Sequence, residues 1–313
     1  MVIVAEEKAV DYALTARLAT EAFADASVQF SPDRIQWLYE KSFGQGTTVL
    51  AALQDGAKIG QIALIGQRLC IAGEAHAAVQ LVDLFVMQAH RSAGLVRQLY
   101  REVERTCAAR GIRYILALPN DKSAQLNARL LKLDPLIELP IRAGLSLRRS
   151  SAKLVCSDRL KTLSHEQAIA LLSPFATSAT ENGVQYDAES LVNRLEDPTR
   201  DYAVHASDAL LLISSQRRLK NLSYTLLCGL FARPQARLAP QSINELVRAA
   251  CTFWNAPLFV YAGVNHSLPK LPGLPLPAWL KRPILVQLRD LAPGSAVAQP
   301  RLARFQLIDS DFA

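Results

Sequence analysis

The spacing of apolar residues in the first half of the chain predicts helices that alternate with strands. Some stretches carry apolar side chains at helical spacing, and others carry them in continuous or alternating runs. We expect helices over residues 8–24, 33–43, 95–110 and 122–133, and strands over residues 47–53, 58–65, 69–71, 77–87 and 113–118. Glycines and an Asp-Gly turn separate these segments.

The second half repeats this order in pattern, without repeating residue identities. Helices are expected over residues 164–175, 188–195 and 240–254, and strands over residues 201–205, 209–216, 222–231, 257–261, 283–288 and 305–308. Two such halves predict a duplicated α/β fold. The polar hinge Arg148-Arg149-Ser150-Ser151 is the expected boundary, with domains over residues 1–149 and 150–313.

A proline-rich stretch covers residues 269–283. Its five prolines exclude a helix or a central strand, because proline lacks the N–H that both structures use. We expect a stiff connecting loop, and a polyproline ligand for a partner domain is the alternative.

Composition excludes several classes of protein. Half of the 313 residues are hydrophobic and 20% are charged, which excludes a mostly disordered chain. No apolar run approaches the roughly 20 residues that cross a bilayer, so we expect no membrane partner and a cytoplasmic protein. The net charge of +7 is interspersed over both halves, so we expect no nucleic-acid partner. A polyanionic small ligand such as coenzyme A remains compatible with the charge.

The cysteines and histidines indicate neither a disulfide framework nor a metal site. The five cysteines are widely spaced and form no C-x-x-C pair. No histidine stands three or four residues from another histidine or a cysteine, so a helical metal pair is not expected.

The most informative segment covers residues 79–99. A predicted strand runs through a turn of small residues, Arg91-Ser92-Ala93-Gly94, into an amphipathic helix. Backbone N–H groups at a helix start lack intrahelical partners and bind phosphate or pyrophosphate well. Gly94 allows close backbone approach, and Arg91 adds positive charge.

These residues resemble a known family. The run Arg91-Ser92-Ala93-Gly94-Leu95-Val96 is similar to the acetyl-CoA pyrophosphate loop of the GNAT superfamily of acyltransferases. Val82-Asp83-Leu84-Phe85-Val86 resembles the fourth strand of that fold, and Pro119-Asn120-Asp121-Lys122-Ser123 resembles a signature that follows its fifth strand. The resemblance covers residues 1–145, including residues 35–39 and the hairpin over residues 49–65, and the second half resembles a degenerate unit of the same type.

The resemblance implies a fold class, an activity and a cofactor. The fold class is α/β (α+β), with tandem GNAT-like mixed β-sheets flanked by helices. The activity is transfer of an acetyl or other acyl group from acyl-CoA to a small-molecule or peptide amine acceptor, with acetyl-CoA as the default donor. The first domain would bind acyl-CoA, and the second would complete the acceptor site or pack as a pseudo-dimer. Homo-oligomer formation is left open.

Particular residues receive roles by this resemblance. The pyrophosphate would be held by backbone N–H groups of the loop, which are those of Arg91, Ser92, Ala93, Gly94, Leu95 and Val96. Pantetheine and the thioester oxygen would be bound by the backbone of the fourth strand at Leu84, Phe85 and Val86. The pantetheine arm would be lined by the side chains of Asn120 and Ser123.

Two departures from the family pattern affect the predicted activity. Val96 stands where the loop pattern ends in Gly or Ala, and its larger side chain crowds the phosphates. Asn127 stands where many members have a tyrosine that acts as general acid toward the thiolate, and an amide has no proton to give at neutral pH. Water or another residue must then protonate the sulfur.

Asp83 is the preferred candidate for a general base. By strand alternation its side chain faces opposite to those of Val82 and Leu84. Glu74 and His76 are weaker candidates, and His90 is expected to be a surface residue.

In the second half, aromatic residues and a nearby Asn-His pair either line an acceptor pocket or pack in the core: Tyr202, Tyr224, Trp254, Tyr261, Asn265, His266 and Trp279. Asp309-Ser310-Asp311 is expected to be a solvated tail.

Two other functions remain open from the sequence. One is a non-catalytic binding or scaffold protein that has kept the fold, which Val96 and Asn127 favour. The other is a Fem-type aminoacyl transferase, whose donor would be aminoacyl-tRNA in place of acyl-CoA.

Overall fold

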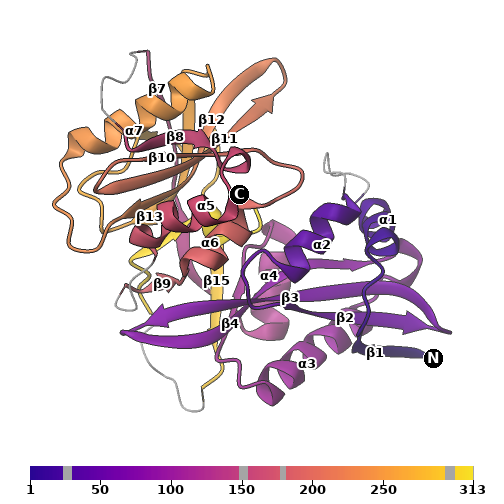
Figure 1. Ribbon diagram of the computed structural model, residues 1–313. Helices are drawn as coiled ribbons and strands as arrows, with labels where there is room; N and C mark the ends of the chain where they lie inside the picture. The colour runs from indigo at the N-terminus through magenta and orange to yellow at the C-terminus, as the bar shows by residue number, and fades with distance from the viewer. Residues whose placement is uncertain (24–29, 148–153, 177–180, 293–299, 313) are drawn as a thin grey trace.

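The computed structural model describes residues 1–23, 30–147, 154–176, 181–292 and 300–312. Its first half is a mixed sheet with helices on both faces (Figure 1). The strands that begin this sheet are β1 (Val2–Glu6), β2 (Thr47–Gln54), β3 (Ala57–Ile71), β4 (Glu74–Val86) and β5 (Tyr114–Ala117). They lie in that order, antiparallel as far as β4, and β5 runs parallel to β4. The strands expected at residues 58–65 and 69–71 are one strand, and β1 was not predicted.

Alternating side chains on the central strands pack against two separate layers of helices. Val49 on β2 joins the hydrophobic cluster under α1 (Tyr12–Ala22) and α2 (Pro32–Glu40). The next residue, Leu50, joins the cluster on the other face, under α3 (Ala93–Ala109) and α4 (Asp121–Leu131). This alternation follows from the period of two along a strand.

Side-chain caps set where these helices begin. Asp11, Ser31, Ser92 and Asn120 each accept a hydrogen bond from a backbone N–H in the first turn of the helix that follows. In α3 the buried face carries apolar residues at the four-residue steps that the sequence predicted: Leu95, Leu99, Val103 and Cys107.

The second half repeats the same order of elements. Its strands are β8 (Cys156–Arg159), β10 (Tyr202–Ala206), β11 (Leu210–Leu219), β12 (Leu222–Ala232) and β13 (Leu258–Asn265). These strands lie in that order, and β12 and β13 are parallel like β4 and β5. The helices are α5 (His165–Leu172), α6 (Ala188–Leu195) and α7 (Pro240–Phe253). Short 3-10 turns lie at Gln88–His90, Leu160–Thr162, Ser173–Phe175 and Leu307–Asp309.

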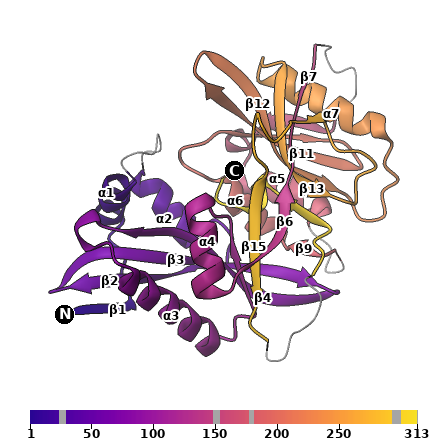
Figure 2. The same ribbon diagram turned by 180° about the vertical axis from the view of Figure 1, so that it is seen from behind.

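The two halves exchange strands. β15 (Ile284–Asp290), from the end of the chain, lies between β5 and β6 (Asp134–Leu139) of the first sheet (Figure 2). In return, β7 (Ile141–Leu145) leaves the first half after Pro140 and pairs with β13 of the second sheet. The two-residue strand β14 (Leu274–Pro275), within the proline-rich stretch, pairs with β7.

Two further short strands join the sheets into one. β9 (Gly183–Val184) pairs with β3 and with β16 (Arg304–Gln306), and β16 pairs with the end of β13. The expected boundary between residues 149 and 150 falls outside the described residues, so it remains a prediction. Of the helices within the described residues, none combines the length and the apolar character needed to cross a bilayer.

Candidate functional site

A wedge opens in the first sheet between β4 and β5. Their pairing ends at Leu81 and Ala117, whereas β4 continues to Val86. β5 cannot follow it, because Pro119 lacks an N–H and Asn120 caps α4. The opening is a cavity of about 320 Å³ lined by Phe23, Ile62, Leu81, Val82, Asp83, Leu84, Tyr100, Ala117, Leu118, Pro119, Asn120, Ser123, Asn127, Asp311 and Phe312.

A bulge in β4 turns Asp83 into this cavity. Gln61 lies opposite Phe85 and Ala63 lies opposite Val82, so that two residues of β4 face one residue of β3. Asp83 takes a positive φ of 50° at this point. The expectation that Asp83 faces opposite to Val82 and Leu84 is wrong for Val82: the bulge breaks the alternation, and Asp83 contacts Tyr39 of the hydrophobic cluster that Val82 joins, whereas Leu84 packs against the cluster on the other face of the sheet. All three residues contribute to the lining of the cavity.

Asp83 is held by hydrogen bonds in partly buried surroundings. The Tyr39 hydroxyl donates to Oδ2 of Asp83 at 2.7 Å, and Nε2 of Gln61 donates to that hydroxyl at 2.9 Å. The pKa of Asp83 is raised from 3.8 to about 6, mainly by burial and in part by the negative charge of Asp311. The hydrogen bond from Tyr39 and the charge of Arg34 oppose this rise.

The end of the chain forms one side of the cavity. Asp309 and Ser310 are fully buried, and Asp311 and Phe312 line the cavity. The expectation of a solvated tail at Asp309–Asp311 is wrong, because residues of other elements bind this segment. Nε2 of Gln80 donates to Oδ1 of Asp311 at 2.7 Å.

Three arginines bind backbone carbonyls of the same segment. Nη2 of Arg34 donates to the carbonyl of Asp311 at 2.8 Å, and Nη1 of Arg200 donates to that of Phe312 at 3.0 Å. Arg194, which is fully buried, donates to the carbonyls of Ile308 and Ser310. No local pattern in the sequence indicates these contacts, because the partners lie more than a hundred residues apart.

A second groove of about 470 Å³ lies at the start of α3. Its walls are Ala22, Phe23, Leu84, Phe85, Val86, Arg91, Ser92, Ala93, Val96 and Leu126. It shares the lining residues Phe23 and Leu84 with the wedge cavity, so the two hollows are neighbours along the free edge of β4.

Backbone donors at the start of α3 face solvent. Ser92 caps the helix by accepting from the N–H of Leu95 at 3.2 Å, and the N–H groups of Ala93 and Gly94 have no intrahelical acceptor. A Cβ placed on Gly94 would meet only the Ser92 hydroxyl, at 3.8 Å. The helix start thus has room for an anion beside its exposed donors.

Arg91 forms hydrogen bonds to two of the elements that line this groove. Its Nε donates to the carbonyl of Val86 at 3.1 Å, and its Nη2 donates to that of Ala22 at 2.8 Å. The guanidinium therefore bridges the end of α1 and the end of β4 by hydrogen bonds. Val96 lines the groove.

Asn120 and Ser123 line the wedge and also cap α4. Oδ1 of Asn120 accepts from the N–H of Ser123 at 2.9 Å and from the Ser123 hydroxyl at 3.0 Å. Asn127 is buried one turn further along, and its Oδ1 accepts a hydrogen bond of 2.6 Å from the Tyr100 hydroxyl. Tyr100 was not singled out from the sequence, because its place on the apolar side of α3 is typical of a core residue.

The weaker candidates for a base lie elsewhere. Glu74 and His76 line a different cavity, of about 680 Å³, and His76 contacts Nη1 of Arg113 at 3.2 Å. Seven residues of strand, about 23 Å, separate His76 from Asp83. His90 ends a 3-10 turn before the loop and lines neither the wedge nor the groove.

The corresponding wedge of the second half is filled. β12 and β13 pair as far as Leu227 and Tyr261 and then separate, and β16 enters between them. The side-chain amide of Gln306 accepts from the N–H of Leu230 at 2.8 Å and donates to its carbonyl at 3.1 Å. Asn265 donates to the same carbonyl at 2.9 Å. The backbone N–H and carbonyl of Leu230 on β12 therefore both have side-chain hydrogen-bond partners.

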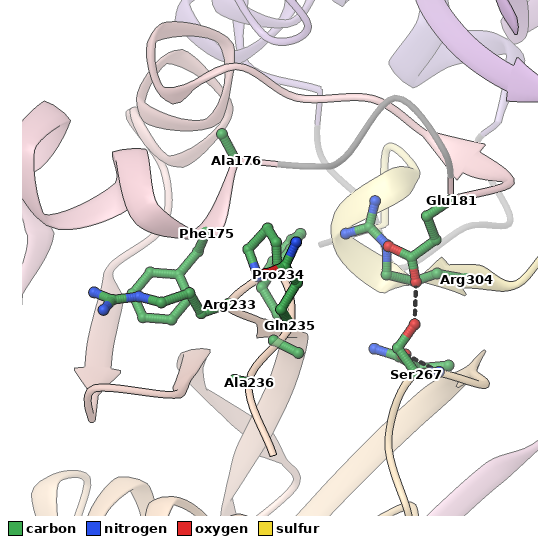
Figure 3. A pocket seen from close by; sticks show the side chains of 12 residues that line it. Phe175, Ala176, Glu181, Arg233, Pro234, Gln235, Ala236, Ser267 and Arg304 are labelled. Carbon is green, nitrogen blue, oxygen red and sulfur yellow. Dashed lines mark hydrogen bonds and ion pairs between the residues drawn. The ribbon is translucent and has the colours of Figure 1, made fainter. Parts of the chain in front are cut away.

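A cavity of about 360 Å³ remains beside the filled wedge (Figure 3). Arg233 stacks on Phe175, with 5.7 Å between the guanidinium carbon and the ring centre, and Arg304 lies 3.7 Å from Glu181. Of the candidate acceptor-pocket residues, Asn265 lines this cavity. Tyr202, Trp254 and Tyr261 are buried in the core, whereas Trp279 is 84% exposed.

Comparison with known proteins finds a family match within the first half. Residues 13–131 match the model of the acetyltransferase (GNAT) family. The matched residues include β4, β5 and the start of α3, and the match confirms for this segment the resemblance seen in the sequence. A search of curated proteins found no match.

Solved structures similar to the whole chain share the GNAT fold. A GCN5-related N-acetyltransferase from Kribbella flavida has a TM-score of 0.65 at 12% identity, covering 96% of this chain and 74% of that chain. N-myristoyltransferase from Saccharomyces cerevisiae, with bound myristoyl-CoA, has a TM-score of 0.60 at 13% identity, covering 96% of this chain and 84% of that chain. A tandem GNAT protein from the clavulanic acid biosynthesis pathway has a TM-score of 0.58 at 11% identity, covering 94% of this chain and 100% of that chain. The predicted fold class, tandem GNAT-like mixed sheets with flanking helices, is confirmed.

Proposed function

We propose that this chain is an N-acyltransferase that moves an acetyl or other acyl group from CoA to an amine. The observation that carries the proposal is the open wedge between β4 and β5 together with the groove at the start of α3. The groove offers backbone donors for a diphosphate, and the neighbouring wedge offers a free strand edge beside a carboxylate.

The backbone supplies most of the binding groups in this proposal. The exposed N–H groups of Ala93 and Gly94 would hold the pyrophosphate, because a helix start favours an anion. The unpaired side of β4 over Leu84 and Phe85 would bind the pantetheine arm and polarise the thioester carbonyl. Asn120 and Ser123 would border the arm on the opposite wall.

Asp83 is the proposed general base. An amine attacks a thioester only after it loses its proton, and a base works best with a pKa near the working pH. Burial brings the pKa of Asp83 to about 6, so the carboxylate is ionised at neutral pH and still able to accept a proton. Asp311 adds a second negative charge, which would attract a cationic amine to this end of the cavity.

The second half would serve the same site without binding a cofactor of its own. Gln306 occupies the backbone groups of β12 that correspond to the free edge of β4. We therefore expect one acyl-CoA per chain. The alternative, a non-catalytic acyl-CoA-binding protein, predicts the same binding with no acyl transfer to any amine in a broad panel.

Calorimetric titration with acetyl-CoA and CoA tests the proposal. Gly94→Glu places a carboxylate at the second position of α3, where it stabilises the helix start but repels a diphosphate. We expect the affinity for CoA to fall at least tenfold in this variant, and less in the uncharged variant Gly94→Gln.

The second half offers a matched control. Gln241→Glu makes the same change at the second position of α7, and it should leave CoA binding unchanged. If the wild-type chain binds neither acetyl-CoA nor CoA at millimolar concentration, the proposed function is wrong.

A further inference from the structure

Two carboxylates line the wedge cavity, and the proposed reaction uses only one of them. Asp83 comes from β4 of the first half, and Asp311 comes from the C-terminal segment of the second. Neither carboxylate forms an ion pair with a described lysine, arginine or histidine: Asp83 is bound by Tyr39, and Asp311 by Gln80. A carboxylate that is partly shielded from water and has no cation beside it favours a cationic ligand.

Buried amides hold the carboxylate of Asp311 in the cavity. Gln67 and Gln80 are 3% and 1% exposed. Nε2 of Gln67 donates to Oε1 of Gln80 at 3.0 Å, so the amide nitrogen of Gln80 is turned to Asp311 and donates to its Oδ1 at 2.7 Å. The other carboxylate oxygen of Asp311 has no hydrogen-bond donor within the part of the chain that the structure describes. One oxygen is thus fixed by the protein, and one is left for a ligand.

Arg34 lies beside this segment but binds other groups. Its Nη2 donates to the backbone carbonyl of Asp311 at 2.8 Å, and its Nε lies 3.4 Å from Oδ2 of Asp197. Asp197 is fully buried, and the same oxygen lies 3.5 Å from Nε of Arg200. The guanidinium of Arg34 therefore positions the backbone of Asp311 and leaves its side-chain oxygens unpaired.

The surroundings of the two carboxylates suit an alkyl chain that carries charge at both ends. The negative charge of Asp311 contributes to the raised pKa of Asp83, so the two groups repel each other across the cavity. A cation bound at Asp311 offsets this repulsion. The apolar side chains of Phe23 and Phe312 line the same cavity and offer a surface on which methylene groups can pack.

We propose that the acceptor is a small aliphatic diamine, and that Asp311 binds its second ammonium group while the first amine reacts beside Asp83. This inference rests on the proposed function, because it names the class of acceptor for that site. The second ammonium keeps its proton and takes no part in bond formation. Asp311 therefore determines specificity, and a monoamine lacks the group that it binds.

Calorimetric titration of amines into the protein saturated with CoA tests this proposal without turnover. Each α,ω-diamine from diaminopropane to diaminooctane is compared with the n-alkylamine and the ω-amino acid of the same chain length, so that the distal charge is positive, absent or negative. We expect at least one diamine to bind about tenfold or more tightly than its monoamine partner, because a charge-assisted hydrogen bond to a carboxylate is strong. The ω-amino acid should bind most weakly, because its carboxylate meets that of Asp311.

Asp311→Asn is the decisive variant. It removes the charge and keeps an oxygen to which Gln80 can donate. The preference for the diamine should disappear in this variant, and the affinity for the monoamine should stay the same. Asp208→Asn, at an exposed carboxylate in the turn between β10 and β11, is the matched control and should keep the full preference.

The possible failures are distinguishable. If CoA binds to the wild type and no diamine binds more tightly than its monoamine partner, the inference is wrong and the proposed function stands. A preference that persists in Asp311→Asn would also overturn the inference, because another group would then bind the second ammonium. If the wild type binds no CoA, the proposed function is wrong, and the inference that rests on it is wrong as well.

Discussion

Replacing Asp83 by asparagine should make the folded protein more stable at neutral pH. Asparagine keeps the size of the side chain and an oxygen to accept from Tyr39, and it tolerates the positive φ at this position. It removes a charge that burial disfavours. The group proposed to carry the chemistry is therefore one that destabilises the fold.

The size of the effect follows from the raised pKa. The Asp83 carboxyl ionises near 3.8 when exposed and near 6 in the folded chain, a difference of about 2 pKa units, which corresponds to at most about 3 kcal/mol. The folded state keeps its proton in the window between these values, whereas the unfolded chain has lost it. The Asp83 carboxyl thus leaves the free energy of unfolding unchanged below about pH 4, and it lowers that free energy increasingly as the pH rises from 4 through 6.

Urea unfolding of the two proteins at pH 4.5 and pH 7.5 measures this difference. The stability of Asp83→Asn relative to wild type should increase by about 2 kcal/mol between the two pH values. Groups common to both proteins, including the buried Asp309, cancel in the comparison. The exposed Asp208→Asn variant should show no such change. A difference between Asp83→Asn and wild type that is independent of pH would refute the argument that burial perturbs this carboxyl.

The same variant tests the catalytic role of Asp83. Wild-type acyl transfer should rise with pH through about 6, as the carboxyl loses its proton. In Asp83→Asn, kcat/KM should fall by about 10²–10⁴-fold, and this acidic limb should disappear. Transfer that keeps both its rate and the limb would show that another group accepts the proton.

Three further substitutions probe the packing and the binding groove. Gln306→Ala should lower the free energy of unfolding by about 1–3 kcal/mol, because it leaves buried backbone groups of Leu230 unpaired. Calorimetry should still find one CoA per chain in this variant. A stoichiometry of two CoA per chain would contradict the filled second wedge. Arg194→Met should cost about 2–5 kcal/mol in urea unfolding by releasing two carbonyls of the C-terminal segment, and unchanged stability would show that this arginine does not hold it. Val96→Ala should tighten CoA binding roughly fivefold by relieving about 1 kcal/mol of crowding, and an unchanged affinity would place Val96 away from the ligand.

Local patterns in the sequence predicted most of the elements. The helix at residues 188–195 has the bounds that its periodicity indicated, and α3 begins at the Ser92 cap beside the small residues of the loop. Caps, turns and apolar spacing act over a few residues, so they can be recognised without the fold. The candidate Asp83 was found in the same way, as a carboxylate on the strand before the loop.

Only the tertiary structure decided how these elements combine. The strand pattern of residues 284–290 suits either sheet, and pairing with β5 and β6 places it in the first. The bulge at Asp83, the burial of Asp311 beside it and the contact of Tyr100 with Asn127 all depend on neighbours distant in sequence. Backbone hydrogen bonding between strands carries no residue code, so periodicity along the chain cannot say which edges meet.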